Sequence, residues 1–452
     1  MRSLSEHYLT SFLNFETQPI VNAGTIFHLK RIKRLLAACS DPQKKYPLIH
    51  VVGTKGKGST AVFIATMLQE AGFKVGLYTS PHVYSLRERI RVLNPRSSPG
   101  EEKNIFCGSL SGHQLSGILK EIKPAIEKVR REKSLGPLTF FEVYTALALA
   151  FFAKQKVDVV VAEAGLGGRL DATNTAGSEI CVFTSMSYDH TQVLGTTLKQ
   201  IAQEKAAIIK SSTRAVFSAP QRPPARLAIE AQAKKFQLKV LTVGRDVRYQ
   251  RISQDRFGVL FSLQGLDHRW PKLRSRLVGE HQVVNASLAA AVVEYFLKGK
   301  KSTIQDVVAK GIARARWPVR FEIVGSNPFV VVDSAHNEDS VAKLAQTVQE
   351  IFPRKRILVL FGASSDKDVR GMLRRLGVIS RDIILTRSKH PRSFDFSSKS
   401  HCFLGVKKMC VTNNAREGLR AARAIARAKD VILVAGSVFL AGEIRALCRS
   451  KI

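Results

Sequence analysis

The chain has 452 residues with an ordinary hydrophobic content of 45%, which is enough for two or three compact domains. It carries 71 Lys and Arg against 36 Asp and Glu, a net charge of +35, but this excess is spread along the chain and forms no arginine-rich tail. No run of 18 apolar residues is present and the six cysteines lack Cys-x-x-Cys spacing, so we expect neither a membrane span nor a zinc or disulfide framework.

The first part of the chain alternates β-branched apolar runs with amphipathic stretches. Strands are expected at 48–52, 74–78, 157–162, 180–184 and 215–218. Helices are expected between them, at 60–71, 114–131, 141–155 and 198–211. This alternation predicts a mostly parallel sheet with helices on both faces.

The region 48–72 predicts a nucleotide-phosphate site. The first expected strand leads into Gly53-Thr54-Lys55-Gly56-Lys57-Gly58-Ser59-Thr60, and a helical pattern follows. Glycines let backbone N–H groups approach phosphate oxygens, and the start of a helix adds the positive end of its dipole. Lys57 is placed to reach the outer phosphates, with the hydroxyl of Ser59 or Thr60 nearby. The alternative, a glycine-rich turn with a chance lysine, is common, but this sequence between a strand and a helix is not.

Two oxygen-bearing groups at strand ends are candidate magnesium ligands. Thr79-Ser80-Pro81-His82 follows the strand at 74–78, which we expect beside the phosphate loop; the alternative is a Ser-Pro turn that merely ends the strand. Glu163 closes a buried apolar run, where a charge is costly unless a cation meets it. A charge at a frayed strand end is the alternative there. Asp171 and Asn174 follow on the next loop, within reach of a ligand.

Asp189-His190 follows another expected strand, and Lys205 lies in the helical stretch after it. A single histidine is usually structural, and a lysine on a helix is usually solvated. The apolar residues 206–209 beside Lys205 raise the alternative that its amine is buried and has a task. The residue pattern alone leaves both interpretations open.

Residues 237–275 have shorter alternating runs, such as 256–263, which predict a small antiparallel sheet, and a helix is expected at 281–297. The polar break that begins at Gly299 is taken as the boundary between domains 1–299 and 300–452. Strands expected at 329–333, 357–361, 382–386 and 431–435 predict a second domain. The expected fold class is α/β, a P-loop ATPase domain with a mostly parallel sheet and a second, smaller Rossmann-like α/β domain.

The second domain has polar groups that suit a nucleotide. Arg320 follows a Trp-Pro-Val turn, and Asp333 follows the expected strand at 329–333, just before His336-Asn337. An arginine suits a phosphate, and an aspartate after a strand suits ribose hydroxyls. We therefore expect a site between the two domains, at the carboxyl ends of their strands.

In this order, these residues resemble the folylpolyglutamate synthase/dihydrofolate synthase family of the Mur ligase superfamily. The resemblance runs from about Tyr8 to Ala446, nearly the whole chain. Its motifs are GTNGKGS at 53–59, TSPH at 79–82, RERI at 87–90, TFFE at 139–142, EAGLGGRLDATN at 163–174, DHT at 189–191, EKA at 204–206, HQxxN at 281–285, AHN at 335–337 and SDKD at 365–368.

The resemblance implies a role for each matched residue. The loop Gly53–Ser59 would hold the ATP phosphates, with Lys57 on the transferred group, and Ser80, Glu163 and His190 would hold two magnesium ions. Lys205 would be the family's carbamylated lysine, a CO₂ adduct beside the metal. The pterin side would be lined by His82, Thr139, Phe140, Phe141, Glu142 and Asp171, and ATP would also be contacted by Asn285, Arg320 and Asp333. His336 is similar to a catalytic residue near the phosphate and the incoming glutamate.

The implied reaction is ATP-driven amide formation. A carboxylate of dihydropteroate or of a reduced folate attacks the γ-phosphate to give an acyl phosphate, and the amine of L-glutamate then displaces phosphate. Catalysis would consist mainly of positioning and charge neutralisation. We expect a cytoplasmic monomer that acts on these small molecules, with no nucleic-acid or membrane partner.

Several positions depart from the family pattern. Lys55 replaces the usual Asn and adds a charge next to the phosphates. Ala207, Ser334 and Val319 replace glycines of EKAG, DGAHN and WPGR. None of these changes removes a group that the resemblance assigns to the chemistry, so they bear on loop geometry and affinity.

Three other functions compete with this one. A cell-wall amino-acid ligase of the same superfamily carries a sizeable UDP-binding domain before the phosphate loop, and only 52 residues precede Gly53. A nucleic-acid-dependent P-loop ATPase would explain the charge, but no concentrated basic arm or aromatic-basic stacking segment is present. A folate-binding protein without activity would require a broken metal site, whereas Ser80, Glu163 and His190 are all present.

Overall fold

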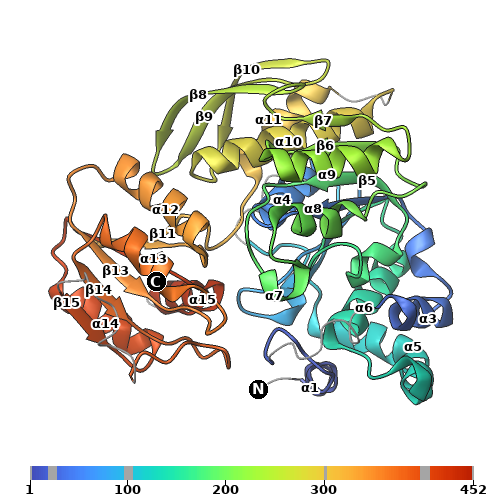
Figure 1. Cartoon of the computed structure of the whole chain (residues 1–452), viewed down its shortest axis with the longest axis horizontal. Helices are drawn as coiled ribbons and strands as arrows, with labels where there is room; N and C mark the ends of the chain where they lie inside the picture. The colour runs from blue at the N-terminus through green and yellow to red at the C-terminus, as the bar shows by residue number, and fades with distance from the viewer. Residues whose placement is uncertain (1–2, 19–27, 96–104, 300–302, 398–407, 450–452) are drawn as a thin grey trace. The chain divides into compact units, whose positions relative to one another are not determined.

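The computed structural model describes residues 3–18, 28–95, 105–299, 303–397 and 408–449. The chain divides into two compact units, coloured blue to yellow and orange to red in Figure 1, apart from short exchanged segments. The first unit comprises Met1–Ile252, Leu260–Arg276 and Glu280–Arg316, and the second comprises Ser253–Val259, Leu277–Gly279 and Trp317–Ile452. The domain boundary expected at 299/300 adjoins the undescribed residues 300–302.

A seven-stranded sheet forms the centre of the first unit, in the order β3-β2-β4-β1-β5-β6-β7. All neighbouring pairs are parallel except β2 and β3, which are antiparallel. Because the central strands are buried on both faces, they are mostly apolar and do not alternate; within β1 and β4 the exceptions are the buried His50 and the terminal Glu163. The strands are β1 (Leu48–Val52), β2 (Val75–Tyr78), β3 (Ile90–Leu93), β4 (Val159–Glu163), β5 (Ser178–Phe183), β6 (Ala215–Ser218) and β7 (Val240–Thr242).

The helices of the first unit fall into groups that cover this sheet (Figure 1). One group consists of α4 (Lys57–Glu70), α10 (Glu280–Leu297) and α11 (Ile304–Arg314), and a second of α3 (Lys30–Ala38), α5 (Gly112–Arg131) and α6 (Phe140–Lys154). Helices α5, α6 and α8 (Leu198–Ala206) each begin with a capping box. The Ser or Thr side chain before the helix accepts a hydrogen bond from the backbone N–H of the third helical residue, and the Glu or Gln side chain of that residue accepts one from the backbone N–H of the Ser or Thr. The remaining helices are α1 (Leu4–Thr10), α7 (Thr191–Leu194), α8 (Leu198–Ala206) and α9 (Pro223–Lys234).

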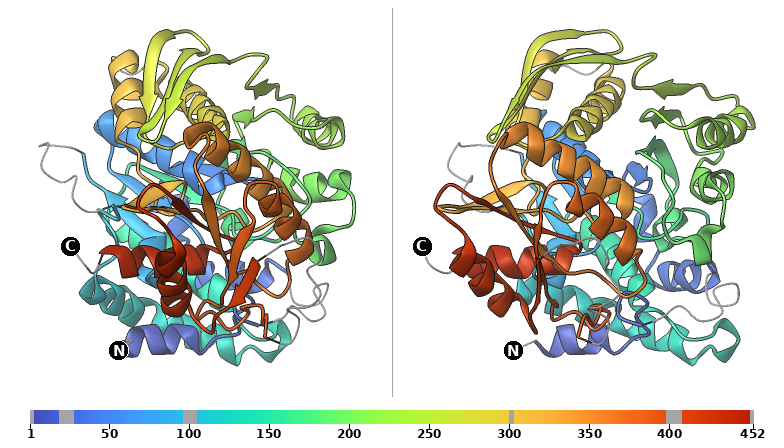
Figure 2. Two further views of the ribbon diagram at one scale, coloured as in Figure 1. Left: turned by 90° about the vertical axis from the view of Figure 1, so that its left-hand side faces the viewer. Right: turned by 60° about the vertical axis from the view of Figure 1, so that its left-hand side comes forward.

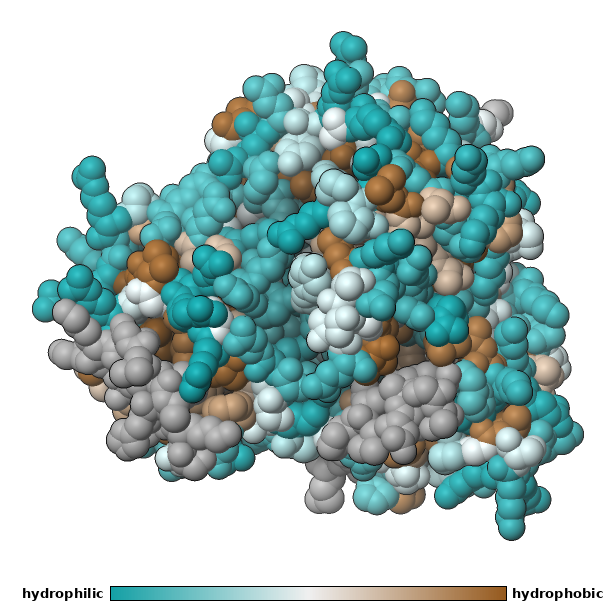
Figure 3. Space-filling view, viewed as in Figure 1, coloured by the Kyte–Doolittle hydropathy of each residue, from teal (hydrophilic) through white to brown (hydrophobic). Residues whose placement is uncertain are grey.

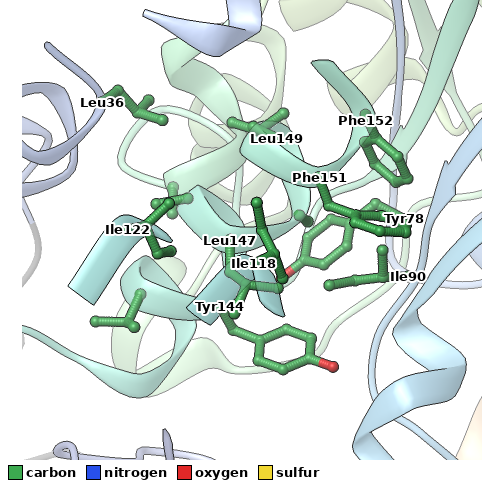
Figure 4. Packing of buried hydrophobic residues seen from close by; sticks show 14 of the residues in the cluster. Leu36, Tyr78, Ile90, Ile118, Ile122, Tyr144, Leu147, Leu149, Phe151 and Phe152 are labelled. Carbon is green, nitrogen blue, oxygen red and sulfur yellow. The ribbon is translucent and has the colours of Figure 1, made fainter. Parts of the chain in front are cut away.

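The second of these groups packs on the sheet through one apolar core. Figure 4 shows Tyr78 of β2 and Ile90 of β3 among Ile118 of α5 and Tyr144 and Phe151 of α6. All of these side chains are at most 3% exposed. Since each fully buried large apolar side chain contributes roughly 1.5–3 kcal/mol relative to exposure, this core fixes the strands that precede the candidate site.

A three-stranded sheet of β8 (Arg248–Asp255), β9 (Gly258–Gln264) and β10 (Arg269–Ser275) confirms a small separate sheet in this region. Two residues join β8 to β9, which requires antiparallel pairing. The prediction was wrong about where this patch begins, because β7 continues the large parallel sheet beyond β6. β7 has only three residues, and so short a hydrophobic pattern does not indicate whether the strand belongs to the parallel or to the antiparallel sheet.

The second unit contains a six-stranded sheet in the order β11-β12-β16-β13-β14-β15. Its strands pair in parallel except β11 with β12. The core formed with α12 (Glu338–Ile351) and α13 (Val369–Gly377) lies on one face, and α14 (Ala415–Ile425) and α15 (Val438–Arg449) lie on the other (Figure 2). The strands are β11 (Glu322–Ser326), β12 (Phe329–Val332), β13 (Ile357–Phe361), β14 (Asp382–Leu385), β15 (Lys408–Val411) and β16 (Val431–Ala435).

The structure confirms the α/β class and the parallel sheets, and it corrects several local predictions. We expected β2 next to β1, but β4 lies between them. The TSPH segment is therefore one strand farther from the phosphate loop than expected. Helix α4 begins at Lys57 instead of residue 60, and α8 ends at Ala206 instead of residue 211. The edge strands β3, β11 and β15 were not predicted, because short strands at sheet edges lack the long apolar run of a central strand.

The visible surface is predominantly hydrophilic. In Figure 3, hydrophilic residues cover most of the visible face, and apolar residues occur there in small separate groups. Among the residues that the structure describes, no helix combines the length and apolarity needed to cross a bilayer.

Two helical glycines should respond in opposite ways to substitution by alanine. In α11, a Cβ at Gly311 would lie 2.6 Å from the Cα of Met67 and 2.9 Å from its backbone nitrogen, whereas a Cβ at Gly117 of α5 would meet nothing within 4 Å. We expect Gly311→Ala to destabilise by about 1–3 kcal/mol through overpacking, despite the helix propensity of alanine. We expect Gly117→Ala to stabilise by about 0.5–1 kcal/mol. Thermal unfolding of both variants measures this; a stabilised Gly311→Ala variant would contradict the close packing of α11 on α4.

Candidate functional site

The phosphate loop joins the carboxyl end of β1 to the first turn of α4. Gly56 precedes the helix with a positive φ of 88°, a conformation that glycine adopts without the strain of a Cβ. Lys57, Gly58 and Ser59 form the first helical turn, where backbone N–H groups have no partner within the helix. Asn285 of α10 lies beside this loop, since a Cβ at Gly56 would be 2.5 Å from its Oδ1. The loop therefore has the geometry of an anion site.

The loop is joined to the segment after β5. The backbone nitrogens of Thr54 and Lys55 donate to the Ser185 carbonyl at 3.0 and 3.1 Å, and the Thr54 hydroxyl donates to the Ser187 carbonyl at 3.1 Å. The Lys55 amine lies 3.0 Å from Asp189 Oδ2. The phosphate loop and the Asp189-His190 segment thus form one hydrogen-bonded assembly.

The candidate metal ligands follow neighbouring parallel strands. Glu163 is the last residue of β4 and pairs in register with Val51 of β1, two residues before the phosphate loop. It is 4% exposed, so the interpretation as a frayed strand end is wrong. Its Oε2 accepts from the Ser80 backbone nitrogen at 3.1 Å, which brings the TSPH segment to the same carboxylate. His190 immediately precedes α7, and its side chain is 38% exposed.

This donor set fits magnesium. Within the described ranges, no three His, Cys, Asp or Glu side chains gather in a way that would hold a metal. Magnesium does not require such a cage, because it binds through one or two carboxylates and retains water and phosphate oxygens. A buried carboxylate next to a serine and a phosphate loop provides ligands of that kind, and the roles of Ser80, Glu163 and His190 remain predictions.

Lys205 is buried within this assembly, which decides between the two interpretations that its sequence left open. It is 4% exposed, and its Nζ donates to the Gly53 carbonyl at 3.0 Å. The glycine of the GLGG loop, Gly168, packs so closely that a Cβ there would lie 2.9 Å from the Lys205 Cα. Burial, and then the nearby charge of Lys57, lowers the pKa of Lys205 to about 7. A substantial share of the amine is therefore unprotonated near neutral pH and able to react as a nucleophile.

The TFFE residues predicted to line the pterin side also have structural tasks. Thr139 caps α6, and its N–H and hydroxyl both donate to Glu142 Oε2 at 2.8 Å. The Glu142 carboxylate is paired with Arg31 at 3.0 Å, both nearly excluded from water. Phe140 is 1% exposed and stacks on Tyr144, while Phe141 is partly buried next to Tyr78. Their roles toward a substrate remain predictions.

Asp171 organises the GLGG loop through a network that the sequence did not predict. Its Oδ2 accepts from the Leu166 nitrogen at 2.8 Å, and its Oδ1 accepts from the Thr173 nitrogen at 3.0 Å and hydroxyl at 2.5 Å. The Thr173 oxygen lies 2.7 Å from Nε2 of His50, whose Nδ1 is 3.2 Å from the Ser178 hydroxyl. Since Thr173 has already donated its proton, His50 donates through Nε2 and Ser178 donates to Nδ1. Burial lowers the pKa of His50 to about 3, so this imidazole is neutral.

His82 belongs to a second unpredicted cluster. Its Nδ1 accepts from the Arg89 guanidinium at 3.1 Å from Nε and 2.9 Å from Nη2. Arg89 is fully buried and binds both Glu16 carboxylate oxygens, at 2.7 and 2.5 Å. Its guanidinium carbon lies 5.5 Å from the ring centroid of Phe140. The RERI motif at 87–90 was the available signal, but the partner Glu16, 73 residues earlier, could not be read from it.

The candidate residues of the second unit follow β12. The Asp333 carboxylate accepts from the backbone nitrogens of Phe321 and Ala335, both at 2.7 Å, which ties the residue before β11 to the segment after β12. Burial raises its pKa, and the positive charge of Arg320 opposes this shift. The Nδ1 of His336 lies 2.8 Å from the Ser334 carbonyl and donates to it, so Nε2 is the acceptor when the ring is neutral.

The three glycine replacements differ in their conformational cost. Ala207 has a φ of −66°, and Ser334 is outside the left-handed region, so neither position requires glycine. Val319 is buried with a φ of 51°, a region that is strained for a β-branched residue. Of these three positions, only Val319 therefore has a backbone conformation that favours glycine.

Comparisons with known proteins agree with this architecture. Residues 131–293 match a family described as the Mur ligase middle domain, and residues 319–438 match the Mur ligase glutamate ligase domain. The dihydrofolate synthase/folylpolyglutamate synthase of Bacillus subtilis is 33% identical over 424 residues, covering 92% of this chain and 94% of that protein.

Solved structures of folylpolyglutamate synthases are similar to this chain as well. The folylpolyglutamate synthase of Mycobacterium tuberculosis, complexed with ADP, superposes with a TM-score of 0.83 at 29% identity over 98% of this chain and 97% of the other. An FPGS in complex with AMPPCP and folate gives a TM-score of 0.81 at 27% identity, covering 98% of both chains. At this coverage the agreement includes both units of the chain.

Replacing Lys205 by methionine, which keeps the length of the side chain without its amine, should stabilise the fold at neutral pH. Because the pKa of Lys205 falls from 10.5 to about 7 on folding, the unfolded chain binds more protons between those values. The stability of the wild type therefore rises with pH across this window, by about 1.4 kcal/mol per pH unit from this group, and the full penalty is present below pH 7. After loss of the hydrogen bond to Gly53, worth about 1 kcal/mol, we expect Lys205→Met to be more stable by about 3 kcal/mol at pH 7.

Urea unfolding in CO₂-free buffer at pH 7 and pH 10 measures this difference. It should vanish or reverse at pH 10, because the folded amine is neutral there and the remaining penalty, less than one pKa unit, is about equal to the hydrogen bond lost in the variant. Lys199→Met, at an exposed position of the same helix, is the matched control and should show no such change. An equal pH dependence of the wild type and Lys205→Met would contradict the lowered pKa.

Proposed function

This chain belongs to the dihydrofolate synthase/folylpolyglutamate synthase family of Mur ligases, and we propose that its phosphate-loop site joins L-glutamate to a pterin-bearing carboxylate. It is an ATP-dependent acid–amino-acid ligase that acts in folate metabolism. The proposal is supported above all by the gathering of Lys57, Glu163 and Lys205 around one loop, in a chain that matches the family over nearly its whole length.

The first chemical step transfers the γ-phosphoryl group of ATP to the carboxylate of dihydropteroate or a folate. The backbone of Gly53–Ser59 would hold the phosphates, and Lys57 would neutralise charge on the transferred group. Asn285, beside Gly56, would contact ATP from α10. In the second step the amine of L-glutamate attacks the acyl phosphate and releases phosphate.

Ser80, Glu163 and His190 would hold Mg²⁺, with two ions expected. When bound, the metal neutralises charge that develops on the phosphate oxygens. The protein's own contribution is the burial of Glu163 at the end of β4, where a bound cation would offset the cost of the carboxylate charge.

Lys205 is proposed to carry a carbamate. Its neutral amine is suited to attack CO₂; with loss of one N–H proton to solvent, the product would be an anionic carbamate next to the phosphate loop. The Gly53 carbonyl, which accepts from the amine in the structure, would keep the nitrogen in place.

Further roles rest on the resemblance. Arg320 and Asp333 would contact ATP, and His336 would act near the phosphate and the incoming glutamate. His82, the residues 139–142 and Asp171 would line the pterin side, and their buried hydrogen bonds supply the rigidity that such a wall requires. We further propose a cytoplasmic monomer that uses no nucleic-acid partner.

Glutamate-dependent phosphate release should occur with dihydropteroate and with tetrahydrofolate as acceptor. Lys57→Ala removes the cation from the transferred phosphate and should lower kcat by about 100-fold or more without lowering the unfolding temperature. Activity with only one acceptor would remove half of the proposal. ATP turnover that responds to DNA or RNA, but not to pteroate plus glutamate, would overturn it in favour of a nucleic-acid-dependent ATPase.

Lys205→Ala should be inactive and should regain activity when a short carboxylic acid such as acetate is added. The added acid would occupy the space of the missing side chain and restore the negative charge of the carbamate. The same acid should not activate the wild type or Lys57→Ala. Full activity of Lys205→Ala without any acid would refute the carbamate.

A further inference from the structure

Lys55, in the phosphate loop, contacts Asp189. Its amine lies 3.0 Å from Asp189 Oδ2, with side chains that are only 18% and 9% exposed. Ion pairs in full contact with water contribute little, because solvent screens them. This pair is largely withdrawn from water, where a charge-assisted hydrogen bond holds its geometry more firmly.

The same carboxylate also holds His190. Asp189 Oδ1 accepts from the His190 backbone nitrogen at 3.1 Å and lies 3.8 Å from its ring Nε2. His190 has a φ of 50°, in the left-handed region that costs energy for a residue with a Cβ. Asp189 is therefore a bridge, with one oxygen on Lys55 and the other on a strained backbone whose side chain is a candidate metal ligand.

Backbone contacts alone leave the position of this carboxylate open. Thr54 and Ser187 exchange two hydrogen bonds, of 3.1 and 3.2 Å, and Ser185 accepts from the loop nitrogens. These bonds end two residues before Asp189. The Lys55 amine extends the connection from the phosphate loop to the Asp189 side chain.

We propose that Lys55 is a positioning residue for the metal site, because its ion pair with Asp189 fixes the segment that carries His190 against the phosphate loop. The proposal rests on the proposed function, in which this loop binds ATP and His190 binds the metal. It differs from the simpler expectation that an added lysine in a phosphate loop binds phosphate itself. In that alternative, Asp189 would compete with the phosphate for the amine.

Substitutions on both sides of the pair separate the two roles. Lys55→Met and Asp189→Asn should each weaken Mn²⁺ binding in the presence of AMPPCP by about tenfold, the effect of losing one hydrogen bond between charged groups. The double variant should be no weaker than either single variant, because both changes remove the same contact. Lys55→Arg keeps the pair and should bind Mn²⁺ within about threefold of the wild type. Electron paramagnetic resonance of free Mn²⁺ measures this binding without catalysis.

Nucleotide binding without metal provides the decisive comparison. In EDTA, calorimetry should give an AMPPCP affinity for Asp189→Asn within about threefold of the wild type. Tighter binding by Asp189→Asn would mean that its loss frees Lys55 for the phosphates, and it would overturn the proposal. Additive losses of Mn²⁺ affinity in the double variant would overturn it as well.

Two controls separate this inference from the proposed function. Glu70→Gln breaks another partly buried ion pair of the same unit, with Arg314 at 2.6 Å, and should bind Mn²⁺ and nucleotide as the wild type does. If Lys57→Met retains full AMPPCP binding, the phosphate site itself is wrongly assigned. If Lys57→Met loses binding while Lys55→Met and Asp189→Asn behave as the wild type, only the role of Lys55 is refuted.

Discussion

The parallel pairing of β2, β4, β1 and β5, in that spatial order, is the constraint on which the candidate site depends. Parallel neighbours bring their carboxyl ends to one edge of the sheet, whatever their separation in the sequence. Ser80, Glu163, the phosphate loop and Asp189 follow these four strands in turn. These site residues, although far apart in the sequence, thus lie along one edge of the sheet. They are brought there by backbone hydrogen bonds between the strands, and not by contacts of their own side chains. The central strands are mostly apolar, since both faces of the sheet are buried.

The same burial makes the polar groups at this edge both costly and effective. Lys205, Glu163 and Asp171 are each at most 5% exposed, and isolated charges at such positions would be strongly unfavourable. The protein compensates Asp171 with hydrogen bonds from its own loop and gives Lys205 one carbonyl partner, which leaves that amine with a lowered pKa. A reactive group maintained in this way lowers the stability of the fold, as is common where structure serves catalysis.

The departures from the family pattern acquire distinct physical meanings. Ala207 and Ser334 have backbone angles that any residue tolerates, whereas Val319 retains a left-handed conformation at a buried turn that precedes Arg320. Lys55 is the one substitution of this set that adds a charge, and the charge meets a carboxylate at 3.0 Å. The partner of this lysine in the structure is thus an acidic residue that follows the neighbouring strand β5.

The sequence by itself determined the fold class, the position of the phosphate loop and the identity of the motif residues, since these depend on local periodicity and on residue order. Lys205 shows where this reasoning stopped: apolar neighbours raised the alternative of burial, but only the structure shows its amine on Gly53. The order of strands, the links from His50 to Asp171 and from Arg89 to Glu16, and the Lys55–Asp189 pair were decided by tertiary structure alone. These contacts join residues 73 to 134 positions apart, and chain spacing carries no information about which of them the sheet brings together.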